Sequence, residues 1–331
     1  MVIWVTLFLE DNKMKYQLRH WLTLLLIILM SGCATHRQFG NQLPTENLKQ
    51  ITPQYAAIQN GRLEYYRFGH GSPIVLIPGY VTDISSWDRQ FLATLADKHQ
   101  LIVFNNRNVG GSYVQSDHYK SQDFARDTYQ LIQKLHLRKP AILGISMGGM
   151  IAQQLAVLYP NKIGQLILIN TAIAGKQSVR PSPTTEKMML NMPTSKFGRY
   201  MIALKLFFPA SQRTQMGFAL ALDRFQPENY TEIDPAAVIS QQRFLVLQWT
   251  KDDATAKKIA RLNLPVLVLN GTADSVIPPV NSNILADTIP HAELKRWQDG
   301  GHAMIYQYPE SIANAVNDFI AQSQEKFNHA E

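Results

Sequence analysis

The sequence of 331 residues contains one cysteine, Cys33, so it excludes an intramolecular disulfide. The formal net charge is +7, but no block of Lys and Arg and no basic stretch interleaved with aromatic residues accompanies it. This distribution predicts a basic surface and no nucleic-acid partner. The sequence also lacks clustered metal ligands, a G-x-G-x-x-G motif and a P-loop. We therefore expect neither a metal nor a cofactor.

The first 33 residues have the plan of a signal peptide. After Met14, two basic residues precede the apolar run LTLLLIILM (22–30), which is short for a membrane span. The next residues complete the sequence MSGC, which resembles a bacterial lipobox, and the resemblance implies lipidation of Cys33. An uncleaved short anchor and a buried apolar segment are the alternatives.

Three expectations follow for this region. Residues 1–13 would place acidic residues ahead of the basic ones, which does not fit a signal peptide. We therefore expect translation to start at Met14. Residues 34–53 are polar and predict a tether between lipid and domain. The protein is then a lipid-anchored lipoprotein of the bacterial cell envelope, facing the periplasm or the cell exterior.

The chain after the tether alternates short β-type runs with helical patterns, which predicts an α/β fold with a mostly parallel sheet flanked by helices. The expected strands are Leu63–Phe68, 74–79, 101–105, 141–146, 166–170, 265–271 and 292–298. The expected helices lie within 85–97, 121–135, 148–160 and 309–322. Four strands are almost continuously apolar, as expected for central strands buried on both faces.

One region interrupts this alternation. Residues 175–255 contain several methionines and paired phenylalanines but no strand pattern, and we interpret them as an inserted helical cap. The core then comprises residues 54–174 and 256–325. Because methionine fits irregular apolar shapes, the composition favours an apolar substrate pocket, although these side chains could equally form the cap's own core.

The stretch LGISMGG (143–149) sets Ser146 between two glycines at the end of a predicted buried strand. Gly144 and Gly148 complete the pattern G-x-S-x-G, in which a sharp strand-to-helix turn exposes a serine nucleophile. An ordinary glycine-rich turn is the alternative. A serine hydroxyl needs a base and an oriented carboxylate to act as a nucleophile.

Two later loops offer these partners. Asp274 follows a predicted buried strand in NGTADSVIP, and His302 follows the last predicted strand in DGGHAM. The chain order is therefore Ser146, Asp274, His302. Asp299 is a competing acid that we expect to be a turn residue, and Asn170, at the end of another strand, is uncharged and cannot serve as the acid.

Together these motifs resemble the α/β-hydrolase fold with a cap. IPGYVTDISSW (77–87) resembles the family's loop after its first central strand, and FNNRNVGGS (104–112) resembles its D-x-R-G-x-G-x-S turn. The resemblance implies Ser146 as nucleophile, Asp274 as acid and His302 as base. It also implies an oxyanion hole formed by the backbone N–H groups of Tyr80 and Met147.

Three residues depart from the family's motifs. Pro78 stands where many members have histidine, and Asn105 and Asn108 replace aspartate and glycine. Asparagine tolerates left-handed backbone angles, so Asn108 can keep the turn.

The implied activity is that of an esterase- or lipase-like serine hydrolase acting on a small apolar carboxylic ester through an acyl-enzyme. The same three residues also serve thioesterases, carbon–carbon bond hydrolases and cofactor-free haloperoxidases, and a non-catalytic binding scaffold on the envelope is a further alternative. The remaining histidines of the core (70, 99, 118, 136 and 291) are expected on the surface. The membrane is the expected partner through the lipid anchor, and the sequence identifies no protein partner.

Overall fold

The computed structural model describes residues 47–191, 193 and 195–328. The predicted signal segment, Met14 and Cys33 lie outside the described residues. None of the helices in the described part of the chain is long and apolar enough to cross a bilayer.

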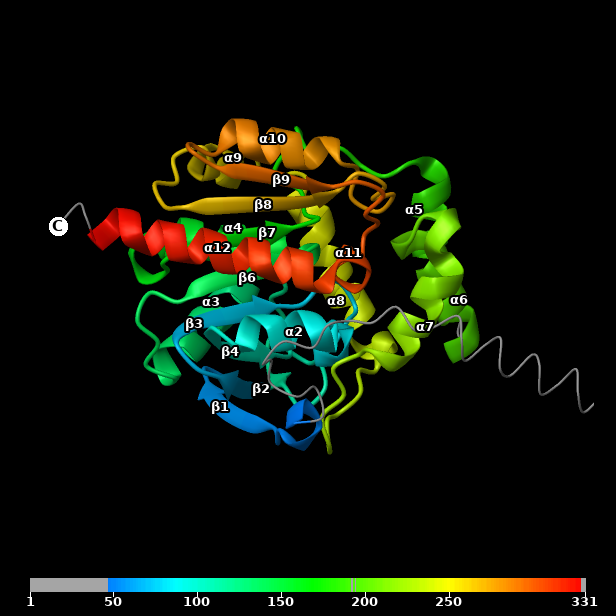
Figure 1. The fold of residues 1–331 in the computed structure, drawn as a ribbon, viewed down its shortest axis with the longest axis horizontal. Coiled ribbons are helices and arrows are strands. Elements are labelled where there is room, and N and C mark those ends of the chain that lie inside the picture. The colour runs from blue at the N-terminus through cyan, green and yellow to red at the C-terminus, as the bar shows by residue number, and fades with distance from the viewer. Residues whose placement is uncertain (1–46, 192, 194, 329–331) are drawn as a thin grey trace, which may run out of the picture. The chain divides into compact units, whose positions relative to one another are not determined.

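Within the described residues, nine strands form one sheet, and the eight on its main path follow the order β1-β2-β4-β3-β6-β7-β8-β9 (Figure 1). The strands are β1 (Gln54–Ile58), β2 (Gly61–Gly69), β3 (Ser72–Ile77), β4 (His99–Phe104), β5 (Tyr113–Val114), β6 (Ala141–Ile145), β7 (Leu166–Ile169), β8 (Val266–Gly271) and β9 (Glu293–Trp297). All neighbours from β4 to β9 along this path are parallel, whereas β2 pairs antiparallel with β1, β4 and β5. The predicted fold class, a mostly parallel sheet between helices, is confirmed.

Two apolar clusters cover the two faces of this sheet. In β3, Val75 and Ile77 belong to one cluster and Ile74 and Leu76 to the other, as the alternation of side chains along a strand requires. The first cluster includes side chains of α3 (Ser121–Lys134), α4 (Met147–Leu158), α9 (Asp253–Ile259) and α10 (Val280–Thr288). The second includes side chains of α2 (Arg89–Ala96), α11 (Met304–Gln307) and α12 (Pro309–Asn328), and α2 and α12 lie together on the near face in Figure 1.

The chain between β7 and β8 carries the helices of the expected cap. They are α5 (Pro183–Leu190), α6 (Lys196–Phe207), α7 (Arg213–Leu222) and α8 (Pro235–Trp249), with the short turn η4 (Ala210–Gln212) between α6 and α7. Three of these helices begin at residues whose side chains accept a hydrogen bond from the first turn, namely Ser182, Ser195 and Asp234. The described residues of the predicted cap segment thus form helices and no strand.

The amino-terminal end of the described chain packs against this region. Asn47–Gln50 forms the turn η1, inside the predicted tether, and Leu48 is buried. Leu48 shares an apolar cluster with Tyr66 and Phe225, which explains why this part of the segment is fixed on the domain. The remaining short turns are η2 (Ile84–Ser86) and η3 (Pro160–Lys162).

Candidate active site

Ser146 occupies the sharp turn between β6 and α4. Its backbone has φ 55° and ψ −122°, a conformation that is unfavourable for a residue with a side chain. Hydrogen bonds hold it there: the Ser146 N–H donates to Ile169 O at 3.0 Å, and the Thr171 hydroxyl donates to Ser146 O at 2.7 Å. These contacts with the neighbouring strand therefore hold Ser146 in its strained conformation, as expected for a nucleophile elbow.

The two glycines beside Ser146 are required by close backbone contacts. A Cβ at Gly144 would lie 2.3 Å from Gly148 O, and a Cβ at Gly148 would lie 2.1 Å from Ile77 O. A side chain at Gly144 would push β6 away from α4, and a side chain at Gly148 would push α4 away from β3. The two glycines of the G-x-S-x-G pattern thus have a steric reason.

Asp274 and His302 lie side by side although they are far apart in the sequence. The distance between His302 Nδ1 and Asp274 Oδ2 is 2.8 Å. The other carboxylate oxygen, Oδ1, accepts hydrogen bonds from Val276 N at 2.8 Å and Ile277 N at 2.9 Å. The side chain of Asp274 is fully buried, so its carboxylate is held on both oxygens. Such a carboxylate fixes the ring and leaves Nε2 as the nitrogen that can accept a proton.

The sheet brings Ser146 to the same edge as this pair. Ile145 of β6 pairs with Ile169 of β7, which in turn pairs with Leu269 of β8, so the carboxyl ends of the three strands are level. Among the described residues, the His302 ring hydrogen-bonds to Asp274 and not to the Ser146 hydroxyl. Hydrogen bonds between catalytic groups are often long without a substrate and tighten when one binds.

Asn170, directly after β7, connects the loops that carry Asp274 and His302. Its amide nitrogen donates to Gly301 O at 3.0 Å and to His302 O at 2.9 Å, and its Oδ1 accepts from Gly271 N at 2.9 Å. The sequence showed that Asn170 cannot be the acid, but it gave no sign of this positioning contact, because all three partners lie more than 100 residues away.

The loop after β3 passes beside Ser146. A Cβ at Gly79 would lie 3.5 Å from Ser146 Cβ, so the backbone at Gly79 and Tyr80 runs past the serine. Met147, directly after Ser146, is the first residue of α4. These positions suit two N–H donors for a developing oxyanion.

Helix α8 of the cap holds this loop. The Gln242 side-chain oxygen accepts a hydrogen bond from Val81 N at 2.5 Å, and the Tyr80 hydroxyl donates to Ile239 O at 3.4 Å. Val81 has φ 51°, which a β-branched residue rarely adopts. Burial also raises the pKa of the Tyr80 phenol. The buried Gln242 thus positions the residue that follows the expected oxyanion donor.

Helix α6, in the predicted cap segment, contacts His302. The ring of Phe207, at the end of α6, lies 5.7 Å from the His302 ring between centroids. Phe207 O accepts from Ala303 N at 3.3 Å, and Ser275 donates its hydroxyl to Leu206 O at 3.1 Å. The end of α6 therefore packs on both the base loop and the acid loop, and it supplies an apolar wall beside the imidazole.

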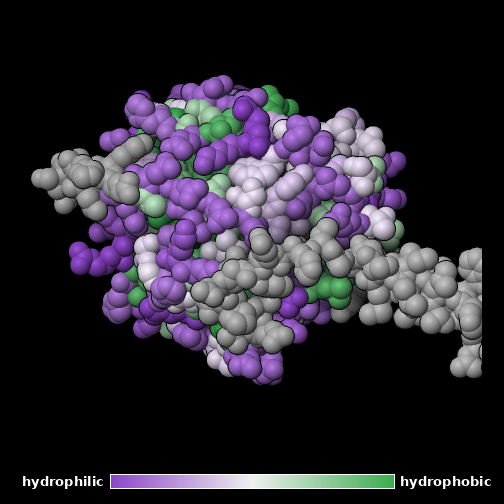
Figure 2. Space-filling model, viewed as in Figure 1, coloured by the Kyte–Doolittle hydropathy of each residue, from purple (hydrophilic) through white to green (hydrophobic). Residues whose placement is uncertain are grey.

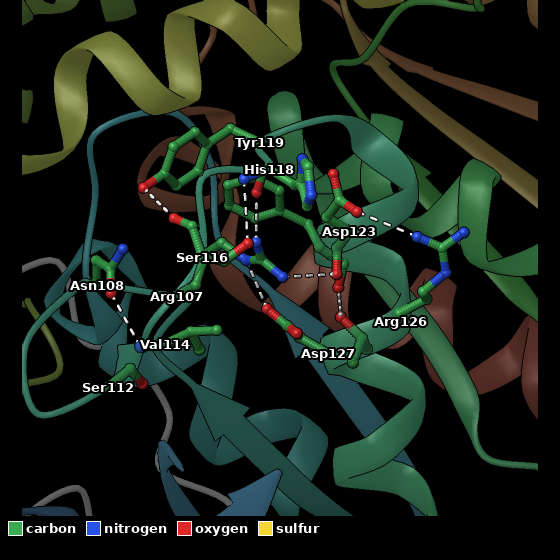
Figure 3. A network of polar contacts seen from close by, with 12 residues as sticks. Arg107, Asn108, Ser112, Val114, Ser116, His118, Tyr119, Asp123, Arg126 and Asp127 are labelled. Carbon is green, nitrogen blue, oxygen red and sulfur yellow. Dashed lines mark hydrogen bonds and ion pairs between the residues drawn. The ribbon is translucent and has the colours of Figure 1, made fainter. Parts of the chain in front are cut away.

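The turn at residues 104–112 is built around a buried arginine (Figure 3). Arg107 Nε lies 2.7 Å from Asp127 Oδ2, and the guanidinium also donates to His118 O at 2.5 Å and Asp123 O at 3.1 Å. Burial raises the pKa of Asp127, and the guanidinium opposes that rise. Asn108 has φ 62°, the left-handed conformation that the sequence suggested asparagine would supply.

The competing residues have other roles. Asp299 is an exposed turn residue with φ 56°, as predicted. Asp252 precedes α9 and accepts a hydrogen bond from Thr255 N at 2.9 Å, so it caps that helix. The prediction for His99 was wrong: it begins β4 and is buried, 2.9 Å from the Ser72 hydroxyl through Nδ1. Among the described residues, no three His, Cys, Asp or Glu side chains group as metal ligands.

Comparison with known proteins gives one family. The model of the family described as "alpha/beta hydrolase fold" matches residues 72–309. The solved structure of an alpha/beta hydrolase fold protein from Chitinophaga pinensis superposes with a TM-score of 0.71 at 24% identity, covering 82% of this chain and 98% of that one.

Curated relatives carry several activities in their names. The poly(3-hydroxyalkanoate) depolymerase of Ectopseudomonas oleovorans is 28% identical over 242 residues, which are 71% of this chain and 80% of the relative. The 3-oxoadipate enol-lactonase 2 of Acinetobacter baylyi is 24% identical over 274 residues, 78% of this chain and 92% of the relative. A match of 29% identity to polyketide synthase ThaQ of Burkholderia thailandensis covers 79% of this chain but 12% of that much longer protein.

Proposed function

Because the chain belongs to the alpha/beta hydrolase fold family and is a hydrolase, we propose that it cleaves a carboxylic ester through Ser146, His302 and Asp274. The observation that carries the proposal is the 2.8 Å hydrogen bond between His302 Nδ1 and Asp274 Oδ2, at the sheet edge where Ser146 occupies a strained turn. The names of the two relatives refer to a polyester and to a lactone, and both are esters.

The reaction has two steps. Ser146 Oγ attacks the ester carbonyl while His302 Nε2 takes the hydroxyl proton, and the resulting oxyanion accepts hydrogen bonds from Tyr80 N and Met147 N. The proton then passes from His302 to the leaving alcohol as the C–O bond breaks. Water then attacks the acyl-enzyme while His302 takes its proton, and that proton passes to Ser146 Oγ as the bond between Oγ and the acyl carbon breaks and the carboxylic acid leaves. Asp274 stabilises the imidazolium ion in both steps.

The contacts of the cap favour an apolar acyl group. Phe207 packs on His302, and the adjoining Phe208 and Leu206 are buried at the same end of α6. We propose a medium-chain or lipid ester as the substrate, because such a chain would extend along this apolar wall.

The test is hydrolysis of p-nitrophenyl esters across acyl lengths by the wild type and by Ser146→Ala. We expect Ser146→Ala to lose at least about 10⁴-fold in kcat. Ser311→Ala, an exposed serine on α12, is the matched control and keeps full activity. Activity that survives Ser146→Ala would refute the assignment. If the protein instead hydrolyses thioesters or carbon–carbon bonds, or brominates a substrate with peroxide, that activity would replace ester hydrolysis as the assigned reaction.

We also propose that Cys33 carries a lipid that anchors the protein in the cell envelope. The proposal rests on the sequence MSGC after an apolar run. Metabolic labelling with a radioactive fatty acid tests it, because Cys33→Ser removes the only thiol in the chain. Label that persists in Cys33→Ser would refute this assignment.

A further inference from the structure

Helices α6 and α7 expose large apolar side chains. Phe197 is 74% exposed and Met201 39% on α6, and Phe218 and Leu222 are each 67% exposed on α7. Of the eleven large apolar side chains most exposed among the described residues, eight lie in segment 175–255, so exposure is concentrated on the cap. Single exposed apolar residues are ordinary, whereas a group on one element marks an interaction surface. We call these four residues the apolar cap patch.

The patch lies on two helices that are fixed to each other. The Tyr200 hydroxyl donates to Gly217 O at 2.6 Å, and a Cβ at Gly217 would lie 3.0 Å from that hydroxyl. Met201 and Phe218 directly follow these two contacting residues in the sequence. Within each helix the two patch residues are four positions apart, so they share one side. In Figure 2, hydrophobic atoms reach the surface where Figure 1 places α7.

Among charged residues, the sequence that carries the patch has basic residues only. Segment 187–222 contains five basic residues and no acidic residue. The acidic residues on either side of it are already paired, Glu186 with Arg180 and Asp223 with Arg89. Lys205 is exposed and continues the spacing of Phe197 and Met201 along α6. Apolar side chains with basic neighbours fit the interface of a bilayer that contains anionic lipids.

The amino-terminal end of the described chain contacts the segment that follows α7. Glu228, shortly after α7, donates its N–H to Lys49 O at 2.8 Å. Fourteen positions separate Cys33 from Asn47, and a fully extended chain of that length spans at most about 50 Å. A lipid on Cys33 would therefore keep the α7 end of the domain within reach of a bilayer.

The patch is also connected to the candidate active site. Phe197 and Met201 lie in the first half of α6, and Phe207 at the end of the same helix contacts the His302 ring. We propose that the apolar cap patch and its basic neighbours bind the surface of an anionic bilayer, from which ester-bearing lipids reach Ser146. The lipid-supply part of this inference rests on the proposed ester hydrolase function.

Site-specific labelling tests the inference on the full chain. Because Cys33 is the only cysteine, Cys33→Ser allows one thiol to be introduced as Phe218→Cys and labelled with a polarity-sensitive fluorophore. The matched control is Tyr113→Cys, since Tyr113 is 58% exposed on β5. We expect vesicles of equal parts phosphatidylcholine and phosphatidylglycerol to shift the emission at position 218 to the blue and to leave position 113 unchanged. Any of three results would overturn the proposal: an unchanged emission at position 218, equal shifts at positions 218 and 113, or a shift at position 218 that is as large with vesicles of pure phosphatidylcholine.

A second measurement separates this inference from the proposed function. Phe197→Ser combined with Phe218→Ser should weaken vesicle binding by at least about tenfold, because two phenyl groups that would enter the bilayer interface are lost. The double variant should hydrolyse a water-soluble p-nitrophenyl ester at the wild-type rate but cleave a vesicle-borne ester more slowly. Equal rates on the vesicle-borne ester would contradict the inference. Ser146→Ala should still give the blue shift at position 218, so a catalytic failure leaves the membrane test intact.

Discussion

Gln242 is expected to control activity through the loop after β3 without touching the substrate. Its side-chain oxygen holds Val81 N at 2.5 Å, and Val81 has φ 51° next to the expected oxyanion donor Tyr80. The substitution Gln242→Ala removes this acceptor. The loop can then relax, and Tyr80 N would turn away from Ser146.

The magnitude follows from two free energies. A part-buried N–H left without an acceptor costs about 1–3 kcal/mol, and a strained backbone at a β-branched residue stores about 1–3 kcal/mol. Losing about 1–3 kcal/mol of support reduces the population of the native loop by about 5- to 150-fold. Removal of an oxyanion donor costs about 10²- to 10³-fold in kcat, which sets the upper limit. We therefore expect kcat for a p-nitrophenyl ester to fall by about 5- to 100-fold, with little change in KM.

Two further variants make the reasoning falsifiable. Gln241→Ala is the matched control, because the oxygen of this neighbouring side chain accepts from Asn108 Nδ2 at 3.2 Å, whereas that of Gln242 accepts from Val81 N. Val81→Gly added to Gln242→Ala should restore much of the activity, since glycine adopts φ 51° without strain. The reasoning is refuted if folded Gln242→Ala keeps wild-type kcat, or if Val81→Gly gives no recovery.

Three other substitutions test the support of the fold and the site. Asn170→Ala should lower kcat by about tenfold, since it frees His302 O and Gly301 O from the amide; unchanged kcat would contradict the positioning role. Arg107→Met should lower the free energy of unfolding, measured in urea, by about 3–5 kcal/mol, because it leaves the Asp127 carboxylate buried and unpaired. The double variant with Asp127→Leu should recover part of this loss. Burial lowers the pKa of His99, so below pH about 6.5 the unfolded chain binds more protons than the folded chain, and stability should fall as the solution is acidified. His99→Gln should flatten this pH dependence of the free energy of unfolding, and equal pH profiles of wild type and variant would exclude the effect.

The sequence predicted the central part of the sheet because those strands are buried on both faces. Runs such as IVLI and LILI became β3 and β7, with every residue from Ile74 to Ile77 and from Leu166 to Ile169 buried. The edge strands β1 and β5 were missed. Of the five residues of β1 only Ala56 is buried, and β5 has two residues, so neither leaves an apolar pattern to detect.

In the candidate site, too, some residues could be predicted from the sequence and others could not. Ser146, Asp274 and His302 stand in short local motifs, and the resemblance supplied their roles. Gln242 and Asn170 act through partners more than 100 residues away, and no local pattern marks such contacts. His99 was misjudged because the expected strand began at residue 101, whereas the register pairs His99 with Ser72 and so buries its side chain at the start of β4.

The departure at Asn105 has a physical explanation in a buried glutamate. Glu64 is fully buried in β2, and its carboxylate accepts from Asn105 Nδ2 at 2.5 Å, Gly111 N at 2.8 Å and the Tyr66 hydroxyl at 3.1 Å. Asn105 Oδ1 meanwhile accepts from Ile84 N at 2.9 Å. An aspartate at position 105 could accept from Ile84, but it would place a second carboxylate against Glu64, and two buried like charges are costly. Asparagine supplies both an acceptor and a donor, so the amide at position 105 and the carboxylate at position 64 form one compatible pair.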